Sequence, residues 1–108
     1  MASKPLPTPV RRAMTEIGED LAIWRRLRNL TIAQVAERAD VARGVVIRLE
    51  AGSGATLEST MRVARALGIL DSLASAIDPY STDIGRLRSE EKLPRRVRHR
   101  VMPHEESP

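Results

Sequence analysis

The sequence predicts an all-α domain of five short helices with flexible basic tails, and three observations carry that prediction. Alternating runs rich in β-branched and aromatic residues, which form strands, are absent. Trp24 and Tyr80 are the only aromatic residues, so a core must be built from Leu, Ile, Val and Ala, which favours small packed helices. Apolar residues recur at helical spacing between about residues 17 and 77. With 108 residues, the chain is long enough for one small domain with tails.

Charge and composition exclude several classes of protein. The net charge is +4, and it is divided into +3 for residues 1–14, −2 for residues 15–85 and +3 for residues 86–108. The absence of Cys removes disulfides and thiolate metal sites and suits a cytoplasmic protein. No apolar run approaches the roughly 18 residues of a membrane-spanning helix, and the N-terminal residues lack the apolar core of a secretory signal.

The N-terminal segment, residues 1–14, is expected to be a disordered, extended arm, because prolines alternate at positions 5, 7 and 9. The first helix is expected to begin near Thr15, where acidic residues follow a capping side chain. Trp24 is interpreted as a core residue rather than a platform for nucleic-acid bases, because it shares a face with apolar neighbours. That buried face is expected to comprise Ile17, Leu21, Trp24 and Leu27.

The next segment predicts two short helices joined by a tight turn. Thr31 and Gln34 have the spacing of a capping box, in which each caps the other at a helix start. A turn follows at residues 39–41. The second helix is expected over residues 42–50, with Val46 and Leu49 facing inward and Gly52 as its stop. Such a pair of helices forms a helix-turn-helix.

The segment LTIAQVAERADVARGVVIRLEAG, residues 30–52, resembles the helix-turn-helix of the phage-repressor (Cro/C1, or XRE) family. The resemblance extends through the flanking helices, over about residues 17–77. It implies a lambda-repressor-like DNA-binding domain of five helices. The matching residues are Leu30, Thr31, Val35, Ala36, Ala39, Val41, Leu49, Glu50 and Gly52.

Three residues depart from the family pattern. Ile32 stands where the family usually has a Gln that reaches a DNA phosphate. Asp40 replaces the Gly of the turn, and Asp tolerates the left-handed region better than most residues. Ala42 replaces the usual Ser or Thr cap of the second helix, which removes about 1 kcal/mol of capping and a potential phosphate contact.

The resemblance implies that the exposed side of the second motif helix faces the DNA major groove. Arg can read guanine through two hydrogen bonds, and branched apolar side chains can contact a thymine methyl. The expected base contacts are Arg43, Gly44, Val45, Ile47 and Arg48. The expected phosphate contacts are Arg28, Thr31, Gln34 and Ala42, although Arg28 has an equal claim to be a solvated side chain.

The resemblance also implies a structural ion pair and a dimer. Arg25 would pair with Glu50, which ends the second motif helix. A fourth helix is expected from about Thr56 to Gly68, with Leu57, Met61, Ala64 and Leu67 at helical spacing. A fifth short helix, capped by Asp71, would form a two-fold dimer contact, as this segment commonly does in the family. Its interface residues would be Ile69, Leu70, Leu73 and Ile77.

The C-terminal segment, residues 79–108, is highly charged. Residues 78–98, DPYSTDIGRLRSEEKLPRRVR, resemble the C-terminal segments of HipB-like antitoxins, small repressors encoded beside HipA-type kinase toxins. Thr82 and Asp83 can cap a short helix that ends before Pro94, and the remainder is expected to be disordered. A disordered charged tail is the alternative for the whole segment, and the basic tails can also reach DNA phosphates or a minor groove.

No enzyme, metal or cofactor site is expected, because both His residues, His99 and His104, lie in the C-terminal tail and no Gly-rich phosphate loop is present. The predicted function is a cytoplasmic, dimeric repressor that binds an inverted repeat in double-stranded DNA, and specifically an autoregulating antitoxin of a HipA-type operon. One alternative is a protein-interaction module in which the helix-turn-helix is only a scaffold. Another is non-specific binding of nucleic acid through the basic tails.

Overall fold

The computed structural model describes residues 4–92 and contains helices but no strand within that range. The all-α prediction is therefore confirmed. The chain divides into two compact units, one that ends at Leu73 and one that begins at Ala74. Among the described residues, no helix combines the length and apolar character needed to cross a membrane. The elements are α1 (Thr8–Leu27), α2 (Ile32–Ala39), α3 (Arg43–Glu50), α4 (Leu57–Leu67), α5 (Leu70–Ala76), the 3-10 helix η1 (Pro79–Ser81) and α6 (Asp83–Lys92).

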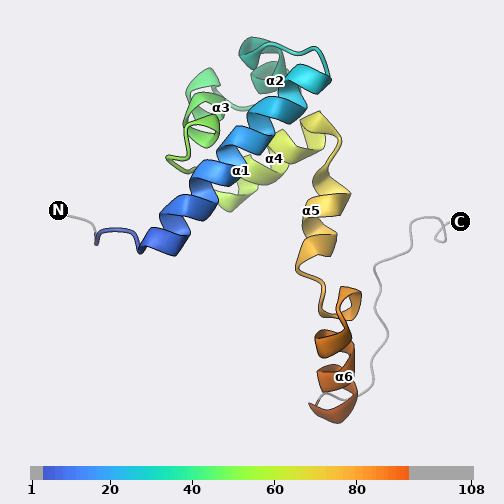
Figure 1. Cartoon of the computed structure of the whole chain (residues 1–108). Helices are drawn as coiled ribbons and strands as arrows, with labels where there is room; N and C mark the ends of the chain where they lie inside the picture. Colours follow the sequence, from blue (N-terminus) through green and yellow to red (C-terminus); the bar gives the residue numbers. More distant parts are fainter. Residues whose placement is uncertain (1–3, 93–108) are drawn as a thin grey trace, which may run out of the picture. The chain divides into compact units, whose positions relative to one another are not determined.

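The core of the first unit is aliphatic, as the composition predicts. In this unit α1 packs against α3, and α2 packs against both α3 and α4 (Figure 1). Full burial of each Leu or Val side chain stabilises the fold by about 1.5–3 kcal/mol. The buried side chains are Leu21, Leu30, Val35, Ala36, Ala39, Val46, Leu49, Val63, Ala64 and Leu67.

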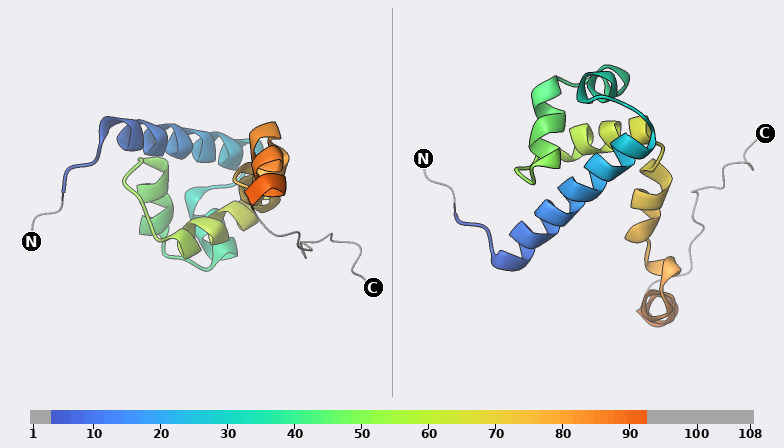
Figure 2. Two further views of the ribbon diagram at one scale, coloured as in Figure 1. Left: turned by 90° about the horizontal axis from the view of Figure 1, so that it is seen from below. Right: turned by 45° about the horizontal axis from the view of Figure 1, so that its top comes forward.

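Helix α1 begins seven residues earlier than the sequence predicted. The expectation of an extended arm over residues 1–14 is wrong from Thr8 onward, where the chain is already helical. Pro7 occupies the cap position and Pro9 lies in the first turn, where a residue without an N–H group costs the helix no hydrogen bond. As a result, the first turns of α1 project past the end of α3 (Figures 1 and 2).

The buried face of α1 also differs from the predicted one. Leu21 is buried as expected, but Ile17 is 49% exposed and Leu27 is 65% exposed, and Trp24 also lies at the surface. The helix instead turns Gly18 inward, where a Cβ atom would lie 2.5 Å from the carbonyl oxygen of Leu49. The spacing of apolar residues indicated the wrong face of α1, because the residue at its closest contact with α3 is a glycine, which has no apolar side chain.

The first four helices end in the same hydrogen-bonded motif. In each, one residue adopts a left-handed conformation, and the next residue donates its N–H to the carbonyl five positions earlier, at 2.9–3.1 Å. This is the Schellman motif, which satisfies carbonyl groups that a helix end leaves free. The left-handed conformation predicted for Asp40 is confirmed. The four residues are Asn29, Asp40, Gly52 and Gly68.

Helix α4 begins as predicted, because the Thr56 hydroxyl accepts a hydrogen bond from the Ser59 N–H at 3.0 Å. Its inward side includes Val63, which the predicted pattern missed, whereas Leu57 is exposed. The predicted cap of α5 is wrong: the helix begins at Leu70, so Asp71 lies in its first turn. The Ile69 carbonyl accepts the first hydrogen bond, from the Leu73 N–H.

The second unit contains η1 and α6. Asp78 caps η1 by accepting a hydrogen bond from the Tyr80 N–H at 2.9 Å. The predicted cap at Thr82 is present, since its hydroxyl accepts the Gly85 N–H at 2.9 Å. A side chain at Gly85 would collide with the Pro79 carbonyl. The predicted helix end before Pro94 and the charged tail beyond it lie outside the described residues.

Because Gly18 lies at a close contact and Gly44 does not, alanine substitutions at these two helix glycines should have opposite effects on stability. Gly18→Ala should destabilise the protein by about 1–3 kcal/mol, because the new Cβ meets the backbone of α3, which cannot move aside locally. Gly44→Ala should stabilise it by about 0.5–1 kcal/mol, because its Cβ would make an ordinary 3.5 Å contact and alanine favours a helix. Urea unfolding of both variants measures the difference. Equal free energies of unfolding would contradict the packing described for Gly18.

Candidate nucleic-acid interface

The start of α2 carries two residues that were expected to contact phosphate. The Thr31 hydroxyl accepts the Gln34 N–H at 3.0 Å, and the Gln34 side-chain oxygen accepts the Thr31 N–H at 2.8 Å. The predicted capping box is therefore confirmed. Both residues are exposed. The Thr31 O–H and the Gln34 side-chain NH₂ are not used as donors by the box, so both can still donate to an anion.

Residues on both sides of the turn between α2 and α3 pack these two helices into the core. Ala42, the cap residue of α3, is extended and exposed and supplies no side-chain hydrogen bond. Val46 and Leu49 are buried in the core, as predicted. Ile32, which departs from the family pattern, is partly buried against the same core. The apolar residue at that position therefore contributes to packing at the start of α2.

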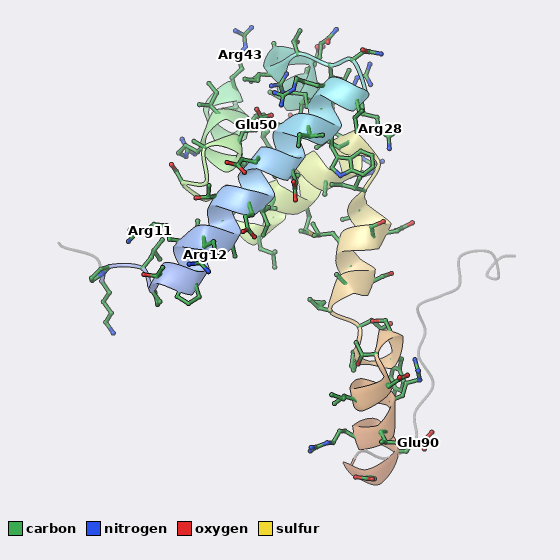
Figure 3. All side chains as sticks on the ribbon, in the orientation of Figure 1. Arg11, Arg12, Arg28, Arg43, Glu50 and Glu90 are labelled. Atoms are coloured by element: carbon green, nitrogen blue, oxygen red, sulfur yellow. The ribbon has the colours of Figure 1, made fainter. Side chains whose placement is uncertain are left out.

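The exposed side of α3 presents most of the predicted base-contacting residues. Arg43 and Arg48 are exposed, and Ile47 is 52% exposed. Arg43 lies at the end of α3 where the helix begins (Figure 3). Val45, also predicted as a base contact, is half-buried and packs against the core. Less of its side chain is therefore available for a base contact than the prediction assumed.

The Arg48 side chain lies close to Gly44. A Cβ atom at position 44 would be 3.5 Å from Nη1 of Arg48. The guanidinium group therefore lies back along α3, toward the end of the helix that carries Arg43. None of the ion pairs in residues 4–92 involves Arg43 or Arg48. Helix α3 consequently carries two exposed arginines that have no ion-pair partner among the described residues.

The predicted pair between Arg25 and Glu50 is present. Nε of Arg25 lies 2.7 Å from one Glu50 carboxylate oxygen, and Nη2 lies 3.1 Å from the other. Nη1 of Arg25 also donates to the Leu30 carbonyl at 3.1 Å. The hydrogen bond with Glu50 raises the pKa of Arg25. Both side chains are largely buried, with 15% and 14% exposure, so the pair joins α1 to the end of α3.

Arg28 has a structural role that the sequence did not reveal. Its Nε donates to the Leu67 carbonyl at 2.9 Å, close to the end of α4. Its guanidinium group lies 5.1 Å from the centre of the Trp24 ring, a distance typical of cation–π contacts. Arg28 therefore holds α1 against the last turn of α4, and the phosphate contact predicted for it stays a prediction.

The residues predicted to form a dimer contact differ in exposure. Ile69 is half-buried and packs against the core, and Leu70 and Leu73 are half-buried. Ile77 is 86% exposed. Within the described part of the chain, no group of three or more His, Cys, Asp or Glu residues is placed to hold a metal ion.

A capped helix, a tight turn and a second helix with an exposed side define a helix-turn-helix protein. The second helix carries unpaired arginines and is held at its far end by a buried ion pair. Residues 21–71 match the family model described as helix-turn-helix. This part of the chain belongs to the Cro/C1-type helix-turn-helix family, also called XRE, whose members are DNA-binding transcription regulators. No curated protein and no solved structure gives a significant match to the chain.

The Arg25–Glu50 contact predicts a strong energetic coupling. In a double-mutant cycle, Arg25→Ala and Glu50→Ala should show a coupling free energy of about 1–3 kcal/mol, because both groups are largely removed from water. The exposed pair of Arg62 and Glu58 on α4 is a matched control and should couple by less than about 0.5 kcal/mol. Urea unfolding of the six variants and the wild type measures both values. Similar couplings for the two pairs would mean that the first pair does not anchor α3.

Proposed function

We propose that this protein is a dimeric transcriptional repressor that reads an inverted repeat through α3. The observation that carries the proposal is the pair of outward-facing guanidinium groups, Arg43 and Arg48, on a helix held in place by its buried side and by Glu50. Guanidinium is the group best suited to bind guanine in the major groove through two hydrogen bonds. Ile47, exposed between them, can contact a thymine methyl.

The size of α3 suits this role. Its eight residues span about 12 Å, close to the roughly 12 Å width of the major groove of B-DNA. Thr31, Gln34 and the backbone at Ala42 lie at the starts of α2 and α3 and are assigned to phosphate contacts. Such contacts fix the orientation of the recognition helix, whereas the contacts to base edges select the sequence.

A dimer is proposed through α5. Leu70 and Leu73 on this helix are half-buried, and Ile77, directly after it, is 86% exposed, so the segment presents apolar side chains at its surface. Two copies related by a two-fold axis would place their α3 helices about 34 Å apart, in successive major grooves on one side of the DNA. An inverted repeat is the sequence that such an arrangement reads.

The proposal predicts the outcome of selection from a randomised duplex library with the full-length protein at about 0.15 M salt. The wild-type chain should enrich an inverted repeat. Arg43→Ala and Arg48→Ala should each weaken binding by about 1–3 kcal/mol and relax the preference at separate base pairs. Arg65→Ala removes the same charge from an exposed position on α4 and should keep the enriched sequence. Retention of DNA without an enriched sequence would overturn the repressor proposal in favour of binding through the basic tails.

A second, more specific proposal concerns the partner of the C-terminal segment. Helix α6 exposes Ile84 and Leu87, which lie three residues apart and therefore on one side of the helix. An exposed apolar surface of this kind suits a protein partner. The sequence resemblance to HipB-like antitoxins points to a HipA-type kinase toxin, in which case the repressor regulates its own operon.

The antitoxin proposal predicts separate effects of two variants. Leu87→Asp should abolish co-purification with a HipA-type kinase encoded beside this chain, because a carboxylate would be buried in the interface, while it leaves operator affinity unchanged. The matched variant Arg43→Ala/Arg48→Ala should lose the operator and retain the kinase. Co-purification with no operator selection by the wild-type chain would favour the protein-interaction module. Absence of such a kinase gene would contradict the antitoxin role.

A further inference from the structure

The projecting turns of α1 place Arg11 on the side of the helix that contacts α3. Positions 11, 15 and 18 follow the i, i+4, i+7 spacing of one helix face. At Gly18, that face meets the last carbonyl groups of α3, and at Thr15 it meets Gly52, whose added Cβ would lie 3.0 Å from the Thr15 Cα. Arg11 is one turn further along the same face, about 10 Å from Gly18. Figure 3 shows it on the side of α1 toward α3.

The loop that joins α3 to α4 provides no positive charge of its own. Its residues, 51–56, read AGSGAT and include no Lys or Arg. The largely buried Arg25 of α1 is engaged with Glu50. Arg11 is exposed, and none of the ion pairs among residues 4–92 involves it. Its hydrogen bond to the Leu6 carbonyl is long, at 3.4 Å. The guanidinium group is therefore free to take another acceptor.

We propose that Arg11 binds a phosphate of the DNA backbone beside the C-terminal end of α3, a contact that rests on the proposed readout of DNA by α3. When the first half of a recognition helix lies in the major groove, its other end leaves the groove next to a sugar–phosphate backbone. The projecting turns of α1 lie beside that end of α3 (Figures 1 and 2). A guanidinium group fits a phosphate through two charge-assisted hydrogen bonds. Arg11 thereby supplies the cation that the loop lacks.

Arg12 offers a matched control on the same turn of the same helix. It is also exposed and unpaired among the described residues. It lies about 100° around the helix from Arg11, on the face that carries Glu16 and Glu19 rather than the face that meets α3. Removal of either arginine changes the net charge equally. A difference between the two variants in DNA affinity therefore reflects the position of the arginine and not the loss of charge.

The test measures the affinity of the full-length protein for its selected duplex over a range of KCl concentrations. Arg11→Ala should reduce the slope of log K against log[KCl] by about 0.9 for each protomer, or about 1.8 for a dimer, and leave the preferred sequence unchanged. Arg12→Ala should leave the slope unchanged, and Arg11→Lys should restore most of it. Thermal unfolding midpoints of all variants should agree with the wild type.

The other outcomes are distinguishable. Equal slopes for Arg11→Ala and Arg12→Ala, whether both unchanged or both reduced, overturn the Arg11 contact but leave the selected sequence, and with it the proposed function, intact. A lowered unfolding midpoint for Arg11→Ala with an unchanged slope assigns Arg11 a structural role instead. Failure of the wild-type chain to select any sequence removes the proposed function itself, before the slopes are compared.

Discussion

The arrangement of the DNA-facing surface depends on the contact between α1 and the C-terminal end of α3. At Gly18 the two backbones approach closely enough that a methyl group would not fit. Two turns further along α1, Arg25 binds both carboxylate oxygens of Glu50 and the carbonyl of Leu30. One side chain thus joins the end of α3 to the segment that leads into α2. A buried pair of this kind contributes geometry more than net stability, and geometry is what a recognition helix requires.

The helix ends also help to fix the geometry of the recognition helix, because they hold the turns between helices in place. Each of the first four helices closes with a left-handed residue and a Schellman hydrogen bond. Three of the residues that follow the left-handed position, Leu30, Val41 and Ile69, are apolar and pack in or against the core. Each turn is therefore held by its own backbone and by the core. The short α3, which has no side-chain cap and contains a glycine, depends on these contacts rather than on intrinsic helix propensity.

Sequence patterns predicted the parts of this structure that have a local physical cause. The capping box at Thr31, the cap at Thr56 and the turn at Asp40 follow from neighbouring residues alone, and all three are present. Two local errors concern helix starts, since α1 begins at Thr8 and α5 at Leu70. The other errors concern tertiary contacts. No local pattern indicates that Gly18 is the residue of closest approach, or that Arg28 reaches the end of α4. The same limit applies to Val45, whose partial burial depends on the packing of α3 against the core.

The net charge of the chain does not determine where it can meet DNA. Residues 15–85 carry a net charge of −2, but at about 0.15 M salt a charge is screened beyond roughly 8 Å, so the charges next to α3 decide the local attraction. There, Glu50 is neutralised by Arg25, while Arg43 and Arg48 are unpaired among the described residues. The extension of α1 back to Thr8 also places the basic residues of its first turns on a folded helix. A basic residue on a folded helix loses less conformational entropy on binding a phosphate than the same residue on a free arm, so helix formation in this segment favours a fixed contact over diffuse attraction.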